Sequence, residues 1–261
     1  MKGNKQQMCK PASESKSVFT FILGMLIALL SVSCATVLRK DPPTIAHVHI
    51  GHAITAWEAA PQNQGLLVVA ELAAVEADTN SQLMMRAVRS GDMAKAKGFL
   101  QQIAVALDPQ TYDPEQPEGY GIRRGTAEAM THLKLASGVF DATSNVRRTV
   151  AQTNIRAQDI LDRADELAVF VDAGLKSDDK EELTIIADEV ATMVKSIASG
   201  PDTPELYGLF NLREDIESMI KREDPPYETV DTYYLFSLVK LPDGQWGFGS
   251  RRGRGAAGPG Y

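Results

Sequence analysis

Cysteine is scarce in this chain of 261 residues, which contains only Cys9 and Cys34. Two cysteines are too few for a zinc site built from cysteine pairs, and no Cys-X-X-Cys-His sequence is present for covalent attachment of haem. The chain also lacks Gly-X-Ser-X-Gly, the phosphate-binding Gly-X-X-X-X-Gly-Lys and the metalloprotease sequence His-Glu-X-X-His. We therefore predict that the protein is not an enzyme and has no catalytic residues.

Basic residues are outnumbered by acidic ones, 27 to 34, which gives a formal net charge of −7 at pH 7. Residues 1–33 hold four lysines and one glutamate, so the chain without them has a net charge of −10. A protein this acidic is a poor candidate for binding nucleic acid, because the phosphate backbone attracts basic surfaces. We exclude nucleic acid as a partner.

The amino-terminal region combines four lysines before residue 17 with an apolar run, Val18 to Leu30, and ends in Leu-Ser-Val-Ser-Cys at Cys34. This arrangement resembles the signal peptide and lipobox of bacterial lipoproteins. The resemblance covers residues 1–34 only. It implies that residues 1–33 are a signal peptide, that Cys34 is lipidated as the mature amino terminus, and that the domain faces the periplasm from a lipid anchor.

Two alternatives remain open for this region. Val18–Val37 is long enough to span a bilayer as an uncleaved signal anchor, although Arg39 and Lys40 would then lie on the translocated side, against the positive-inside tendency. An ordinary cleaved signal peptide is the other alternative. All three place the domain outside the cytoplasm. Ala35 after the cysteine favours the outer over the inner membrane by the sorting rule of enteric bacteria.

Apolar residues at helical spacing predict a mainly α fold, a bundle of about five helices over residues 45–223, connected to the lipid by a tether over 34–44. The first two long helices are expected over 66–89 and, after a cap at Asp92, over 93–107. The strongest signal is an alternation of four and three that predicts one long helix over 126–175, bent or broken once at most. Its seam consists of His132, Ala136, Val139, Thr143, Val146, Val150, Thr153, Ala157, Ile160, Ala164, Leu167 and Val171.

The sequence changes character after Pro225-Pro226. Residues 224–250 are rich in aromatic and β-favouring residues, and Leu241-Pro242-Asp243-Gly244 has the composition of a turn. We expect a small C-terminal β-hairpin in this segment. The Gly- and Arg-rich residues 251–261 are expected to form a flexible tail.

Three of the four histidines lie close together, at His47, His49 and His52. Neutral imidazole is a common ligand for transition metals and haem. In an extended segment His47 and His49 share a side, whereas in a helix His49 and His52 share a face. The fourth, His132, is expected to face the bundle interior. It can complete a site if the first helix and the long helix are neighbours.

Two functions follow from these features. The first is a non-enzymatic accessory or scaffold lipoprotein that holds a protein partner at the envelope. The alternative is a lipoprotein that binds a transition metal or haem through His47, His49, His52 and His132, for electron transfer, metal handling or sensing. A bundle without a metal or haem also agrees with the sequence, if the histidines only cap helices or pack in the core.

Overall fold

The computed structural model describes residues 38–113, 115, 119–200, 207–228, 230–235, 238–240 and 246–248. It divides into two compact units. One comprises Pro42–Thr229 and is helical, and the other comprises the two ends of the chain, Met1–Asp41 and Val230–Tyr261. The predicted signal peptide, Cys34 and the predicted tail lie outside the described residues.

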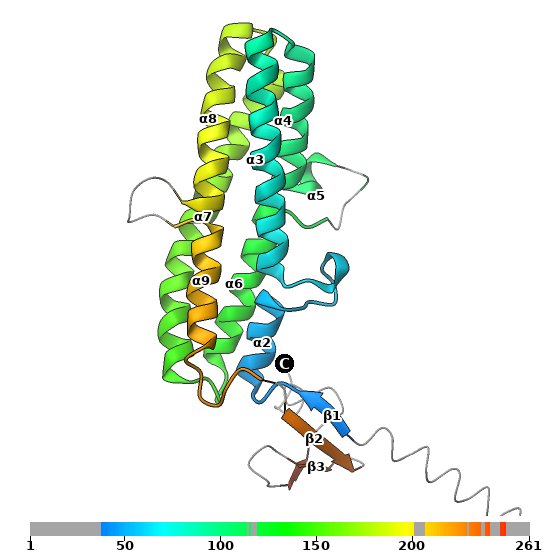
Figure 1. Cartoon of the computed structure of the whole chain (residues 1–261), viewed down its shortest axis with the longest axis vertical. Coiled ribbons are helices and arrows are strands. Elements are labelled where there is room, and N and C mark those ends of the chain that lie inside the picture. Colours follow the sequence, from blue (N-terminus) through cyan, green and yellow to red (C-terminus); the bar gives the residue numbers. More distant parts are fainter. Residues whose placement is uncertain are drawn as a thin grey trace, which may run out of the picture. The chain divides into compact units, whose positions relative to one another are not determined.

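The helical unit confirms the prediction of a mainly helical bundle (Figure 1). Its described residues form eight α-helices, more than the five or so expected, because the expected long helix is divided and a short helix begins at Pro109. A 3-10 turn, Pro61–Asn63, lies between the first two. The helices are α2 (Ile45–Ile54), α3 (Leu66–Ser90), α4 (Met93–Leu107), α5 (Pro109–Tyr112), α6 (Ile122–Gly138), α7 (Ser144–Lys176), α8 (Lys180–Ser199) and α9 (Leu209–Ile220).

Helices α3 and α4 form an antiparallel hairpin at the positions that the sequence predicts. Gly91 ends α3 with a φ of 79°, a left-handed conformation that glycine adopts without steric cost. Asp92 then caps α4, since its side chain accepts a hydrogen bond from Lys95 N. The face of α3 that enters the core is built largely from small residues, so its neighbours approach closely. Ala70, Ala74 and Ala77 are each completely buried.

The expected long helix is divided into α6 and α7, with the break at residues 139–143. Gly138 weakens the end of α6, and the Thr143 side chain caps α7 by accepting a hydrogen bond from Val146 N. The seam nevertheless continues on both sides, because Ala136 and Val146 are both completely buried.

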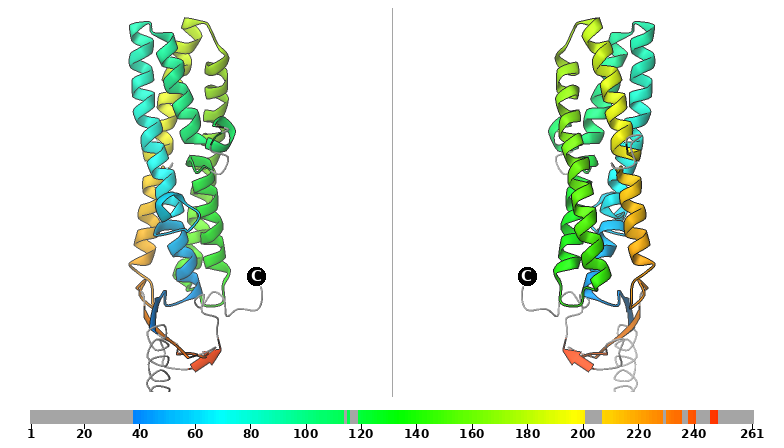
Figure 2. Two further views of the ribbon diagram at one scale, coloured as in Figure 1. Left: turned by 90° about the vertical axis from the view of Figure 1, so that its right-hand side faces the viewer. Right: turned by 90° about the vertical axis from the view of Figure 1, so that its left-hand side faces the viewer.

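Helix α7 packs against α4, α6, α8 and α9, while α3 packs against α4, α6, α8 and α9 from the opposite side of the core (Figure 2). The core between them is aliphatic. Its largest completely buried side chains include Leu67, Leu100, Ile103, Leu133, Ile160, Leu167 and Ile197. No described helix combines the length and apolar character needed to cross a membrane.

The second unit contains β1 (Leu38–Asp41), β2 (Val230–Leu235), β3 (Leu238–Lys240) and β4 (Trp246–Phe248). They pair antiparallel in the order β1-β2-β3-β4. Part of the predicted tether is therefore a strand, which pairs from Leu38 opposite Tyr233 to Asp41 opposite Val230. The C-terminal hairpin stays a prediction, because residues 241–245, which would contain its turn, lie outside the described residues.

Candidate metal centre

Helix α2 begins where three backbone N–H groups find side-chain acceptors. Thr44 Oγ1 accepts a hydrogen bond from His47 N at 3.2 Å. The Asp141 carboxylate, from the α6–α7 connection, accepts from Ile45 N at 2.7 Å and from Ala46 N at 3.1 Å. These contacts satisfy donors that a helix leaves unpaired at its amino terminus, and they fix the position at which α2 starts. The break between α6 and α7 therefore places the residue that caps α2.

The rotational setting of α2 directs two of its histidines toward α6. Ile50 and Ala53 are completely buried in the core. His49 and His52 each precede one of these residues and, being three apart, lie on one face of the helix. That face packs against α6, where His132 is located. The helical alternative for this segment is therefore the one observed, and the first helix and α6 are neighbours.

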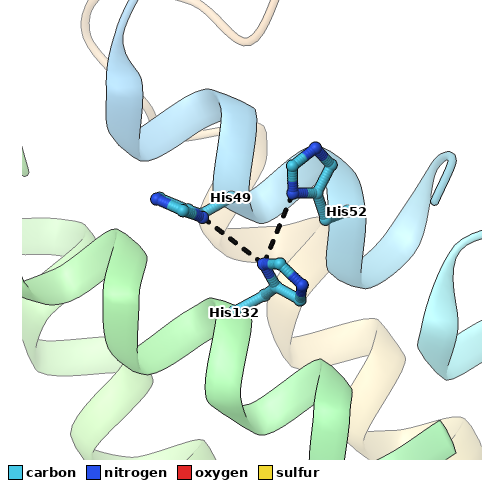
Figure 3. Close-up of side chains that lie close together, drawn as sticks. All are labelled: His49, His52 and His132. Atoms are coloured by element: carbon cyan, nitrogen blue, oxygen red, sulfur yellow. Dashed lines mark hydrogen bonds between the residues drawn. The ribbon is translucent and has the colours of Figure 1, made fainter. Parts of the chain in front are cut away.

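Three imidazole rings converge between the two helices (Figure 3). His132 Nδ1 lies 3.4 Å from His49 Nδ1 and 3.3 Å from His52 Nδ1. Each residue offers one nitrogen to a group whose members all lie within 4.8 Å of one another. Among the described residues, this is the one group of three or more His, Cys, Asp or Glu side chains with the spacing of a metal site.

Hydrogen bonding alone does not account well for both contacts of His132 Nδ1, one with His49 Nδ1 and one with His52 Nδ1. In a neutral imidazole Nδ1 carries either one hydrogen or one lone pair, so it makes a single well-directed hydrogen bond in the ring plane. His132 Nδ1 faces a nitrogen of His49 and a nitrogen of His52 at once. A metal ion bound by all three rings would resolve this conflict, because it would accept a lone pair from each ring.

The observed spacing agrees with coordination of one ion. Two nitrogens bound to Zn²⁺ at about 2.0–2.1 Å in a tetrahedral arrangement lie about 3.3–3.4 Å apart. The two Nδ1–Nδ1 distances to His132 are 3.4 and 3.3 Å. The remaining pair, His49 and His52, lies within the 4.8 Å that spans the group.

All three rings are in the form that binds metal. Burial lowers the pKa of His49 and of His132, and the neighbouring imidazole of His49 lowers the latter further. Burial, together with the rings of His132 and His49, lowers the pKa of His52 to about 4. At neutral pH each ring is therefore uncharged and keeps a lone pair for a ligand bond.

Trp57 forms an aromatic wall on one side of the group. Its ring centroid lies 4.6 Å from that of His52 and 4.6 Å from that of His132, with interplanar angles of 57° and 58°. The His52 and His132 rings themselves meet edge to face, with centroids 4.8 Å apart. This packing restricts the rotamers of two of the three donors, which reduces the entropy that ordering them for a ligand would cost.

His47 is not part of the group. It is almost completely buried, and its Nδ1 lies 2.5 Å from Thr44 Oγ1. Its ring packs against Tyr227, with centroids 5.2 Å apart. On a helix His47 and His49 are two positions apart and face different directions. Of the four predicted metal ligands, the structure thus brings together His49, His52 and His132, and it places His47 at the start of α2.

Three supporting residues were not assigned a role at this site from the sequence. Asp141 lies within the expected long helix over 126–175, so nothing in the sequence suggested that it caps α2. Thr44 directly precedes the first residue of α2 and could have been recognised as a cap from the preference of threonine for that position. Trp57 lies beyond the end of α2 at Ile54.

Comparisons with known proteins do not extend this description. A scan against protein-family models, a search of curated proteins and a search of solved structures each found no match.

Proposed function

We propose that this protein binds a transition-metal ion through His49, His52 and His132. The observation that carries the proposal is the convergence of three neutral imidazole nitrogens from α2 and α6, with Nδ1–Nδ1 distances of 3.3 and 3.4 Å to His132. The lowered pKa values of all three rings support it, because protonated histidine cannot be a ligand.

The donor set favours borderline ions such as Cu²⁺, Zn²⁺ and Ni²⁺. Imidazole suits these metals, whereas Mg²⁺ and Ca²⁺ prefer the oxygen ligands that the group lacks. Haem is the weaker alternative. A haem iron with two axial histidines needs them on opposite faces of a flat macrocycle, and here the three nitrogens point at one small volume.

A metal titration of the purified protein tests this function. We expect one equivalent of Cu²⁺ or Zn²⁺ to bind, measured by calorimetry and by metal content after gel filtration. His132→Gln should weaken binding at least about 10–100-fold, since even loss of a group that only orients a ligand has that effect. His47→Gln is the matched control, because His47 lies on the same helix outside the group. Equal affinity in both variants, or no binding to the wild type, would overturn the proposal.

Tryptophan fluorescence reports on the location of the ion. The chain has two tryptophans, Trp57 and Trp246. In a Trp246→Phe background, bound Cu²⁺ should quench the remaining indole, whose ring lies 4.6 Å from two of the ligand rings. Copper that binds without quenching Trp57 would be located elsewhere.

We further propose that the metal site belongs to a lipoprotein of the bacterial cell envelope, anchored through Cys34 and favouring the outer membrane. The support is the resemblance of residues 1–34 to a lipoprotein signal peptide. In this location a lipid-anchored histidine site suits metal handling or sensing in the periplasm. Mass spectrometry of the mature protein tests the anchor. A diacylated or triacylated Cys34 at its amino terminus is expected, and residues 1–33 still attached would favour the signal anchor.

An accessory or scaffold role is the second candidate, and exposed apolar side chains favour it. Phe140 is 84% exposed and Leu135, at the nearby end of α6, is 46% exposed. The proposed aromatic-rich hairpin within residues 224–250 would add a second surface for a partner. Co-purification from native membranes tests this role: Phe140→Ser should lose a partner that the wild type retains, while keeping one equivalent of metal.

A further inference from the structure

The charge of a bound ion would not be balanced by its protein ligands. His49, His52 and His132 are neutral donors, and no carboxylate or thiolate from the described residues joins them. A divalent ion in this group would therefore keep its full double positive charge in a half-buried environment. Such a charge attracts an anion much more strongly than it would in bulk water.

The two carboxylates whose charge acts on these rings, Asp141 and Glu128, already accept hydrogen bonds from other groups. Asp141, which opposes the fall in the pKa of His49, accepts hydrogen bonds from Ile45 N and Ala46 N. Glu128, which opposes the fall in the pKa of His132, accepts hydrogen bonds from Tyr120 and Arg124, both at 2.8 Å.

Moving either carboxylate onto the metal would break these contacts. Loss of the Asp141 contacts would expose the amino terminus of α2, and loss of the Glu128 contacts would leave the Arg124 guanidinium without that ion pair. Both carboxylates therefore make the electrostatic potential at the three rings more negative, and neither is expected to become a ligand of the metal.

Three protein ligands also leave the coordination of the ion incomplete. Zinc sites closed for a structural role use four protein ligands, whereas sites that keep an exchangeable position use three. The three histidines are each half-buried, so each residue keeps some surface in contact with solvent. Trp57 packs against the rings of His52 and His132, with both centroids at 4.6 Å, and supplies no donor atom to the ion.

We infer that the ion at His49, His52 and His132 keeps an open coordination position that binds a small anion from solution. This inference rests on the proposed metal binding. The ligand class is a compact anion with one donor atom, such as hydroxide, which would neutralise half of the excess charge. The metal would then bind an exchangeable ligand from solution, and the site would differ from a closed structural site that only links α2 to α6.

Azide is the probe for this position, because it gives a charge-transfer absorption band only when it is bound directly to Cu²⁺. The full chain loaded with one equivalent of Cu²⁺ is titrated with sodium azide and followed by absorption and electron paramagnetic resonance. We expect a saturable band with 1:1 stoichiometry and a shifted copper spectrum. His47→Gln should retain the band, and His49→Gln should lose at least nine-tenths of it at the same total copper.

The possible outcomes separate this inference from the proposed function. Copper bound with His132-dependent affinity but with a spectrum that azide does not change would overturn the open position and leave metal binding intact. Failure to bind copper would overturn both. An azide band of equal strength in wild type and His49→Gln would place the responding copper outside the group and refute the inference as well.

Discussion

Metal binding should stabilise the fold, because the three ligands come from two helices that separate on unfolding. A ligand present at 100 times its dissociation constant, and bound only by the folded state, adds about 2.7 kcal/mol to the free energy of unfolding. For a domain of the size of Pro42–Thr229 each kcal/mol raises the melting temperature by about 2–4 °C. We therefore expect Zn²⁺ at this concentration to raise the melting temperature by about 5–11 °C.

Thermal unfolding followed by circular dichroism measures this shift, with zinc chosen because it has no redox chemistry. The triple variant His49→Gln/His52→Gln/His132→Gln should show no shift, while His47→Gln should keep that of the wild type. A shift below about 1 °C in the wild type at saturating zinc would mean that the group does not bind the ion in the folded state. An equal shift in the triple variant would show that zinc stabilises the fold through other residues.

Two further predictions concern the scaffold that positions the site, and a third concerns the amino-terminal cysteine. Leu167→Ala, at a completely buried residue of α7, should cost about 2–5 kcal/mol in denaturant unfolding, whereas Val169→Ala, 67% exposed on the same helix, should change stability by less than about 0.5 kcal/mol. Similar costs for the two would contradict the observed phase of α7. Asp141→Ala removes the acceptor for two N–H groups of α2. It should lower the free energy of unfolding by about 0.5–2 kcal/mol and weaken zinc binding. Unchanged zinc binding would show that the ligands do not need this cap. Cys34→Ser should leave a larger, unprocessed precursor on immunoblots, and normal processing would refute lipidation.

Helix periodicity predicted much of the bundle, because an amphipathic face must be buried wherever it lies in the chain. Val146, Ile160, Leu167 and Val171 were expected on one buried stripe, and all four are completely buried. The end of α3 and the start of α4 followed from Gly91 and Asp92, whose preferences are local. These features need no knowledge of which helices are neighbours.

The break between α6 and α7 was harder to locate, since the alternation of four and three continues through it. Ala136 and Val146 both face the core, so the apolar pattern alone fits one helix as well as two. Thr143 and Asp141 determine the break through capping contacts, one within α7 and one with the distant helix α2. The second contact depends on tertiary structure and has no sequence signature.

The sequence predicted that histidines form the candidate site, and three of the four histidines it named belong to the group. The sequence predicted that His49 and His52 share a face if the segment is helical, and that His132 completes a site if α6 lies alongside. It left the conformation of the segment open. The capping of α2 by Thr44 and Asp141 decides that conformation, and with it the separation of His47 from the other three.

Burial also changes the pH range over which this site would bind metal. Three histidines with the ordinary pKa of about 6.5 would each lose about tenfold in affinity at pH 5.5, a combined loss of about 1,000-fold relative to pH 7.5. The pKa of His52 is lowered to about 4, so this residue stays neutral at pH 5.5 and contributes none of that loss. The pKa values of His49 and His132 are also lowered, so they contribute less than unperturbed rings would.

We therefore expect the affinity for Zn²⁺ to fall by less than about 100-fold between pH 7.5 and 5.5, measured by competition with a chelator of known pH dependence. Burial lowers the pKa values of the three rings, so most of them stay unprotonated in mildly acidic solution and keep a lone pair for a metal. A fall of about 1,000-fold would show that the rings titrate as if exposed, and that α2 does not hold His49 and His52 against α6 in solution.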